Sequence, residues 1–231
     1  MFGGAFMYAS GAHIGIGYGS AGALVQGRPT SVTGEGNGNS LYGWGIAHEI
    51  GHQMDTLGKA ETTNNIYSLF GQTHDGGQNA LPSRLETSNK YEKIFEKTSI
   101  GAVGLSNDVF VSLGMYWQLH LAYDLGADDN FYNLVNKAYR NNIGKGLSGD
   151  QRFAVVASYV AQKDLSEFFE RWGLNLSDDV KSQMNQYEKE SRKIYYLNDQ
   201  SRREAMAGTA PVTGNIEVNA SIDQKTATVT I

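Results

Sequence analysis

Apolar residues recur at helical spacing along most of the chain, and this pattern predicts a mostly helical domain. Residues 107–126 are apolar almost throughout, with Asn107 or Asp108 as N-cap and Gly126 as a stop, so we expect a buried central helix there. Residues 88–99 mix charged and apolar side chains as a surface helix does. The other predicted helices span residues 41–54, 127–140, 149–162 and 163–173.

Residues 1–27 have a different texture, because they contain no Asp, Glu, Lys or Arg and are rich in glycine. They lack the basic segment of a signal peptide, and glycine at this density disfavours a membrane-spanning helix. Strands and tight turns are expected instead, with residues 13–17 as an edge strand that an extended substrate could join. The predicted fold class is therefore α+β, mostly helical, with a small N-terminal β part.

The composition changes again after the last predicted helices. Residues 207–214 are small and resemble a linker, and residues 215–231 alternate like a strand or hairpin. So short a segment cannot bury a core of its own. We expect residues 1–206 to form one domain, truncated at its N-terminus, and residues 215–231 to begin a β-rich module of a longer, multidomain parent chain.

The charge of the chain excludes one class of partner. The formal net charge is −5 and the isoelectric point is about 5.5. A surface that binds phosphates needs clustered Lys and Arg, and the sequence has no strong cluster, so no nucleic-acid partner is expected. The absence of cysteine excludes disulfides and thiolate chemistry within the chain.

The sequence HEIGH at residues 48–52 carries the clearest chemistry. On a helix, His48 and His52 lie on one face about 6 Å apart along the axis, so both imidazoles can reach one metal ion. A catalytic zinc binds three such side chains and keeps a fourth position for water. Glu49 can then take a proton from that water as general base. The motif predicts metal-assisted hydrolysis, with a peptide as the favoured substrate.

The third ligand is expected to be Glu61, nine residues after His52. Gly58 is interpreted as the end of the first helix, so Glu61 would project from the start of a second helix packed against it. Asp55 is the alternative, but one helix face rarely supplies three ligands to one ion. Asp55 is better suited to accept a hydrogen bond from a histidine ring N–H.

Substrate contacts are expected on both sides of this motif. The candidates are Trp44, one helical turn before His48, and His74, Asp75 and Arg84 in the loop of residues 71–84. Packing of Trp44 into the core is the alternative, as is an ordinary solvated loop for residues 71–84. The candidate donors to the developing oxyanion are His120, Tyr116 and Tyr123 on the central helix, and for each of them taken alone core packing is the favoured interpretation.

The segments GWGIAHEIGHQMD (43–55) and ETTNNIYSLF (61–70) resemble the enhancin-like zinc metallopeptidases. This is a gluzincin family that includes viral enhancins and bacterial mucin-degrading enzymes. Residues 6–17, 168–177 and 194–199 are also similar to that family, and the likeness covers most of residues 2–199. It implies a zincin-like catalytic domain in which His48, His52 and Glu61 bind zinc and Glu49 is the catalytic base.

The resemblance also implies a substrate class and a location. Family members act on glycoproteins, often mucins with O-linked glycans, and a secreted or cell-surface protein is expected on that basis. We therefore predict a zinc-dependent endopeptidase that hydrolyses glycoproteins. Two alternatives stay open, namely a glycan-binding or adhesion module with an inactive metal site and a general endopeptidase with no preference for glycans.

Overall fold

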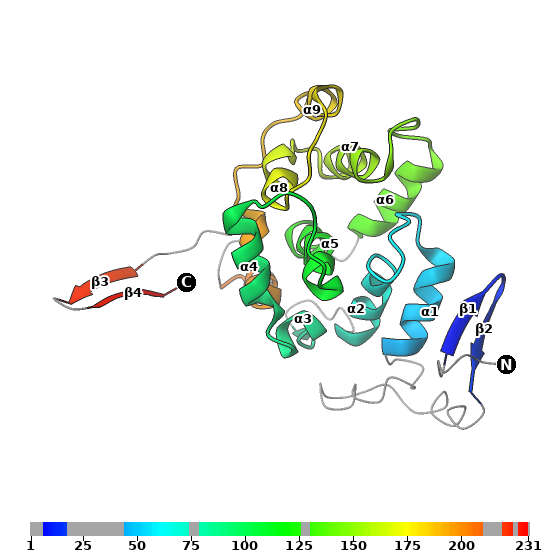
Figure 1. The fold of residues 1–231 in the computed structure, drawn as a ribbon, viewed down its shortest axis with the longest axis horizontal. Coiled ribbons are helices and arrows are strands. Elements are labelled where there is room, and N and C mark those ends of the chain that lie inside the picture. The colour runs from blue at the N-terminus through cyan, green and yellow to red at the C-terminus, as the bar shows by residue number, and fades with distance from the viewer. Residues whose placement is uncertain are drawn as a thin grey trace.

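A computed structural model describes residues 7–17, 44–73, 79–125, 130–209, 219–223 and 226–230, the last two ranges by their backbone alone. Most of the described chain is helical (Figure 1). The helices are α1 (Trp44–Met54), α2 (Asn65–Thr73), α3 (Arg84–Thr87), α4 (Lys90–Ile100), α5 (Val109–Tyr123), α6 (Phe131–Arg140), α7 (Gly149–Ala161), α8 (Ser166–Arg171), α9 (Asp178–Met184), the 3₁₀ helix η4 (Ile194–Tyr196) and α10 (Asp199–Met206).

Helix α5 is the buried centre of the domain, as its apolar sequence predicts. It begins at Asp108, whose carboxylate accepts hydrogen bonds from the backbone N–H groups of Phe110 and Val111. Leu113 and Trp117 are at most 1% exposed, and α2, α4 and α6 lie around this helix (Figure 1). The helix ends at Tyr123, and the predicted stop at Gly126 lies outside the described residues.

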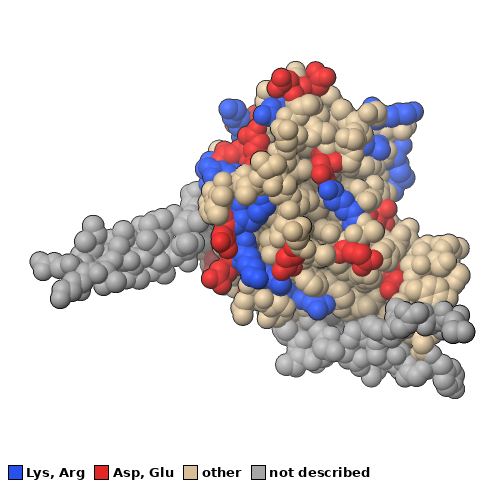
Figure 2. All heavy atoms as spheres, viewed as in Figure 1, with Lys and Arg blue, Asp and Glu red and all other residues tan. Residues whose placement is uncertain are grey.

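The predicted surface helices are also present, each within a few residues of its expected bounds. Helix α4 turns Tyr91 and Ile94 into the core and leaves its charged residues outside. Figure 2 shows basic side chains over α4 with acidic side chains beside them, as expected for the exposed face of an amphipathic helix. Helices α6, α7 and α8 correspond to the predictions for residues 127–140, 149–162 and 163–173.

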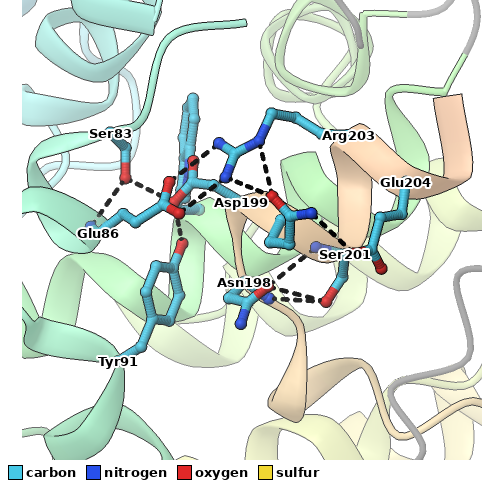
Figure 3. Close-up of polar contacts among 10 residues, drawn as sticks. Ser83, Glu86, Tyr91, Asn198, Asp199, Ser201, Arg203 and Glu204 are labelled. Atoms are coloured by element: carbon cyan, nitrogen blue, oxygen red, sulfur yellow. Dashed lines mark hydrogen bonds and ion pairs between the residues drawn. The ribbon is translucent and has the colours of Figure 1, made fainter. Parts of the chain in front are cut away.

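A buried carboxylate fastens the last helix of the domain to the helices around it (Figure 3). Asp199, at the start of α10, accepts hydrogen bonds from Tyr91 (2.6 Å), Ser83 (2.7 Å) and the indole N–H of Trp117 (3.0 Å). Burial raises the pKa of Asp199 above its ordinary value. These three bonds join the start of α10 to α3, α4 and α5.

Helices α1 and α2 pack against each other unusually closely. Gly51 lies opposite the backbone of Asn64, and a Cβ built on Gly51 would be 2.2 Å from the Asn64 carbonyl oxygen. Further along, the Ser68 hydroxyl donates to the carbonyl of Trp44, and the Tyr67 hydroxyl donates to that of Met54. Only glycine at position 51 permits this approach, which brings the segment before α2 onto the face of α1 that carries the histidines.

The described strands form two hairpins. Strands β1 (Met7–Ser10) and β2 (His13–Ile16) are antiparallel, and β1 lies against α1 (Figure 1). Strands β3 (Asn219–Asp223) and β4 (Thr226–Thr230) form a second antiparallel pair, drawn away from the helical body in Figure 1. The predicted fold class is therefore confirmed. Residues 13–17 do supply a strand, and its pairing with a substrate stays a prediction.

Candidate metal centre

Helix α1 presents two imidazoles on one face. The ring centres of His48 and His52 are 4.8 Å apart with perpendicular planes. The side chains are 19% and 24% exposed, so both are reachable from solvent while packed against the protein. The helix ends at Met54, four residues before the expected stop at Gly58. That earlier ending changes how the third ligand candidate reaches the site.

Glu61 reaches the histidines from a turn, and the expectation that it begins a second helix is wrong. It lies in the turn of residues 60–64 with φ of 64°, before α2 starts at Asn65. Its carboxylate oxygens are 3.2 Å from His48 Nε2 and 3.3 Å from His52 Nε2. A non-glycine residue with positive φ is strained by about 1–3 kcal/mol and persists only where its surroundings hold it.

Asp55 is the residue that shapes this connection. Its carboxylate accepts hydrogen bonds from Leu57 N (2.9 Å), Gly58 N (3.2 Å) and the Thr63 hydroxyl (2.6 Å). The sequence suggested that Asp55 would accept from a histidine ring, and this is wrong. Asp55 directly follows α1, so its carboxylate meets the free N–H groups of the turn ahead of it.

Asn65 is the partner of the histidine instead. Its Oδ1 is 2.7 Å from His48 Nδ1, and its Nδ2 donates to the Glu61 carbonyl at 2.7 Å. At 3% exposure this amide is fixed in place. One side chain therefore orients two of the three ligand candidates. Sequence reasoning missed Asn65, although its position four residues after Glu61 at a helix start was a usable signal.

Two further side chains complete the surroundings. The fully buried Asn64 places Nδ2 3.1 Å from His52 Nε2 and 3.3 Å from His48 Nε2. Glu49 is 8% exposed, and within the described part of the chain no donor lies within hydrogen-bonding distance of its carboxylate. A buried carboxylate is costly to desolvate without a partner. The Glu49 side chain is thus available to a group from outside the protein.

The three ligand candidates fit a small divalent metal ion. One atom each from His48, His52 and Glu61 lies within 4.8 Å of the others. Ligand atoms at about 2.1 Å from a tetrahedral zinc lie roughly 3.4 Å from one another. Each imidazole has a different oxygen of Glu61 near that distance, at 3.2 Å for His48 and 3.3 Å for His52. If His48 Nδ1–H donates to Asn65 Oδ1, Nε2 is left as a ligand.

Of the predicted substrate contacts, the structure brings Trp44 and Arg84 together. The Arg84 guanidinium carbon is 4.8 Å from the centre of the Trp44 ring, and Trp44 also packs on Phe110 at 5.7 Å. Trp44 is half-buried, which lies between the two predicted alternatives of a substrate contact and a core residue. The other two candidates, His74 and Asp75, lie outside the described residues.

Two of the predicted oxyanion donors, His120 and Tyr116, are buried in α5, and Tyr123 at the end of this helix is partly buried. His120 is fully buried, with its Nδ1 2.5 Å from Asp124 Oδ2. Tyr116 is 1% exposed, and burial raises its pKa. Tyr123 donates its hydroxyl to Glu190 at 2.7 Å. The role of these three residues as oxyanion donors stays a prediction.

Comparison with known proteins gives one family. The profile described as "Peptidase M60, enhancin and enhancin-like" matches residues 4–173. A search of curated proteins gives no match. In the described residues no helix has the length and apolar character needed to span a bilayer.

Several solved structures share the fold. The M60 catalytic domain of ZmpC from Clostridium perfringens, in complex with the sialyl T antigen, is 30% identical over 96% of this chain and 40% of its own, with a TM-score of 0.67. The M60 catalytic domain of ZmpB from the same organism, with its CBM51-1 and CBM51-2 domains, is 30% identical over 87% of this chain and 20% of its own (TM-score 0.66). A functionally unknown conserved protein from Bacillus anthracis is 28% identical over 86% of this chain and 40% of its own, with a TM-score of 0.67. The chain thus spans less than half the length of each.

Proposed function

The chain belongs to the M60 peptidases, the family of enhancin and enhancin-like proteins, and on that premise we propose that it is a zinc-dependent endopeptidase that cleaves glycoproteins. The observation that carries the proposal is the convergence of His48, His52 and Glu61 within 4.8 Å. Two imidazoles and one carboxylate are a donor set of catalytic zinc sites. A glycan-binding module with no chemistry would have no use for a buried, unpartnered carboxylate beside that set.

His48, His52 and Glu61 would hold the ion. When bound, it would supply positive charge and Lewis acidity at the reacting carbonyl. Asn65 serves this site by holding His48 in one tautomer and by fixing the backbone of Glu61. The side chains of the protein are thus arranged before any substrate arrives, and little ordering remains to be done in the transition state.

Glu49 is the general base of the proposed reaction. The oxygen of a water molecule attacks the peptide carbonyl carbon while one of its protons passes to the Glu49 carboxylate. The C–N bond then breaks, and Glu49 returns that proton to the leaving amine nitrogen. Its 8% exposure limits competing water around the carboxylate. The proposal includes no oxyanion donor from the described residues.

The glycan preference is proposed from the relatives. The ZmpC domain that is 30% identical over 96% of this chain was solved with the sialyl T antigen. We extend that substrate class, O-glycosylated proteins of mucin type, to this chain, with a secreted or cell-surface location. The ZmpB domain occurs with further domains in its own chain, and we propose additional domains for the parent of this chain.

The test is a comparison of metal content and cleavage in three proteins reconstituted with zinc. The wild type is expected to hold one zinc per chain and to cleave a mucin. Glu49→Gln keeps the zinc and loses about 10²–10⁴-fold in cleavage rate, and His48→Ala loses both. Glu92→Gln, an exposed change on α4, is the control for a lost carboxylate. Retained proteolysis in Glu49→Gln would contradict the proposal.

A second arm separates the alternatives. Removing the glycans from the mucin enzymatically should lower the rate of cleavage by the wild type. Equal cleavage of the glycosylated and deglycosylated forms would identify a general endopeptidase. Full zinc occupancy with no cleavage of any glycoprotein would identify a binding module.

A further inference from the structure

The guanidinium of Arg84 packs against two aromatic rings that also contact each other. Its central carbon lies 4.8 Å from the centre of the Trp44 ring and 4.6 Å from that of Phe110. These residues come from three elements, since Trp44 begins α1, Arg84 begins α3 and Phe110 lies in the first turn of α5. Contact with both rings restricts the guanidinium and leaves N–H groups along its edge for hydrogen bonds.

The N–H donors of that edge are not used within the described protein. The backbone N–H of Arg84 donates to Gln72 Oε1 at 2.7 Å, but no acceptor among the described residues lies within hydrogen-bonding distance of the Arg84 side chain. The neighbouring carboxylates are engaged elsewhere. Glu86 pairs with Arg203 at 2.7 Å, and Asp108 pairs with Lys90 at 2.7 Å.

The charges at this point do not cancel. Lys90 and Asp108 form a neutral pair next to Phe110, with the Lys90 Nζ 5.7 Å from the centre of that ring. Arg84 is half-buried and adds one positive charge with no carboxylate of its own. A single carboxylate would balance this charge, and its two oxygens match the parallel N–H groups of a guanidinium. Figure 2 shows basic side chains over α4 with acidic side chains beside them.

The Trp44 ring that contacts Arg84 belongs to the same helix as the histidines of the candidate metal centre. Trp44 precedes His48 by one turn on the same face of α1, which is about 6 Å along the helix axis. We propose that Arg84, held by Trp44 and Phe110, is a specificity residue that binds a carboxylate carried by the substrate beside the scissile bond. The proposal rests on the function proposed above. The carboxylate could belong to a terminal sialic acid or to an Asp or Glu side chain of the peptide, and the chemistry of recognition is the same.

Binding provides a test that is independent of cleavage. In the Glu49→Gln protein, the affinity for a sialylated O-glycopeptide should exceed that for its desialylated form, or the affinity for a Glu-containing peptide should exceed that for its Gln counterpart. Which pair shows the difference identifies the source of the carboxylate. We expect the ratio of the two affinities to be about ten in the parent protein, and adding Arg84→Gln should reduce this ratio to one. Adding Arg84→Lys should leave only a part of it, because the fork is lost and the charge remains.

The control is Lys93→Gln, which removes an exposed positive charge from α4 and should leave the preference intact. Melting temperatures show whether each variant folds. Equal weakening of both members of each pair by Arg84→Gln would mean that Arg84 only joins three helices, and this would overturn the proposal. So would the absence of any preference in the parent protein. Because these assays need no hydrolysis, failure of the peptidase proposal would be seen separately, in the cleavage experiment.

Discussion

Asn65 Oδ1 lies 2.7 Å from His48 Nδ1, and the same amide donates to the Glu61 carbonyl. Removing it with Asn65→Ala should let the His48 ring rotate and should loosen the turn that carries Glu61. Groups that orient metal ligands typically contribute about 10–100-fold to metal affinity. We expect a loss of that size for zinc, measured by competition with a chromogenic chelator.

Asn130→Ala is the matched control for the loss of an asparagine. Asn130 caps α6 by accepting from the backbone N–H of Asn133 at 3.2 Å. Its removal should cost about 1 kcal/mol of folding stability and leave zinc affinity unchanged. Equal losses of zinc affinity in both variants would show that Asn65 acts only on stability.

Gly51→Ala should separate α1 from the segment that carries Asn64 and Glu61. The added Cβ would lie 2.2 Å from the Asn64 carbonyl oxygen, so the backbone must move. We expect a loss of about 1–3 kcal/mol in unfolding free energy, together with weaker zinc binding. Urea unfolding and chelator competition measure the two effects.

Gly71→Ala on α2 is the control for that change. Its Cβ would meet only the Ala47 Cβ at 3.5 Å, an ordinary contact. Alanine is preferred to glycine within a helix by about 0.5–1 kcal/mol, so this variant should be as stable as the wild type or more stable. A destabilised Gly71→Ala protein would mean that helix α2 tolerates no change, and the result at Gly51 would lose its specificity.

Asp199 gives a prediction for pH dependence. Burial raises its folded-state pKa above the ordinary 3.8, so the folded protein holds this proton more tightly than the unfolded chain. The resulting stabilisation is full below pH 3.8 and is lost as the pH rises through the folded pKa. The unfolding free energy of the wild type, relative to the non-titrating Asp199→Asn, should therefore fall as the pH rises through this window.

Asp199→Asn should also lower stability itself. An amide cannot accept from Ser83, Tyr91 and Trp117 without turning its NH₂ group toward one of these donors. We expect a cost of about 1–3 kcal/mol, measured by urea unfolding at each pH. Asp179→Asn, an exposed change in the first turn of α9, is the control. A flat difference between wild type and Asp199→Asn across the pH series would contradict the prediction.

The proposed domain boundary can be tested by deletion of residues 210–231. The hydrogen bonds that join α10 to other helices come from Asp199, Arg202 and Arg203, and the last described residue before the hairpin, Thr209, bonds back to Glu204. A chain that ends there should melt at the same temperature as the full chain and bind zinc equally well. A lower melting temperature would place the β3–β4 hairpin inside the domain and would remove the proposed linker of residues 207–214.

Features that depend on local periodicity could be predicted from the sequence. Helix α5 follows from an apolar run capped by Asp108, and the spacing of His48 and His52 is sufficient to place both on one helix face. Glu61 was expected at the site for its distance from His52, but its backbone was predicted wrongly. Gly58 was taken as the helix stop, whereas the helix ends at Met54 and Asp55 accepts the hydrogen bonds of the following turn.

Features that depend on side chains meeting across the fold could not be predicted. Asn65 bonds to His48 from seventeen positions away in sequence, and no periodicity encodes that contact. His120 and Tyr116 were candidate donors because of their chemistry, and their full burial in α5 does not follow from that chemistry. In the sequence, the rest of α3 and all of α4 lie between Arg84 and Phe110. The two residues meet only because the start of α3 and the start of α5 lie together.

Because Glu61 is an exposed side chain on a turn, removal of metal should make this part of the protein sensitive to proteases. Its side chain is 63% exposed and leaves a turn with an unfavourable backbone angle. A cation bound by Glu61 and by the histidines of α1 would hold that turn in place. Removing the cation with a chelator should therefore loosen the connection between α1 and α2 first. In limited proteolysis of metal-depleted protein, the first cleavage should then fall between α1 and α2, before the other helices unfold.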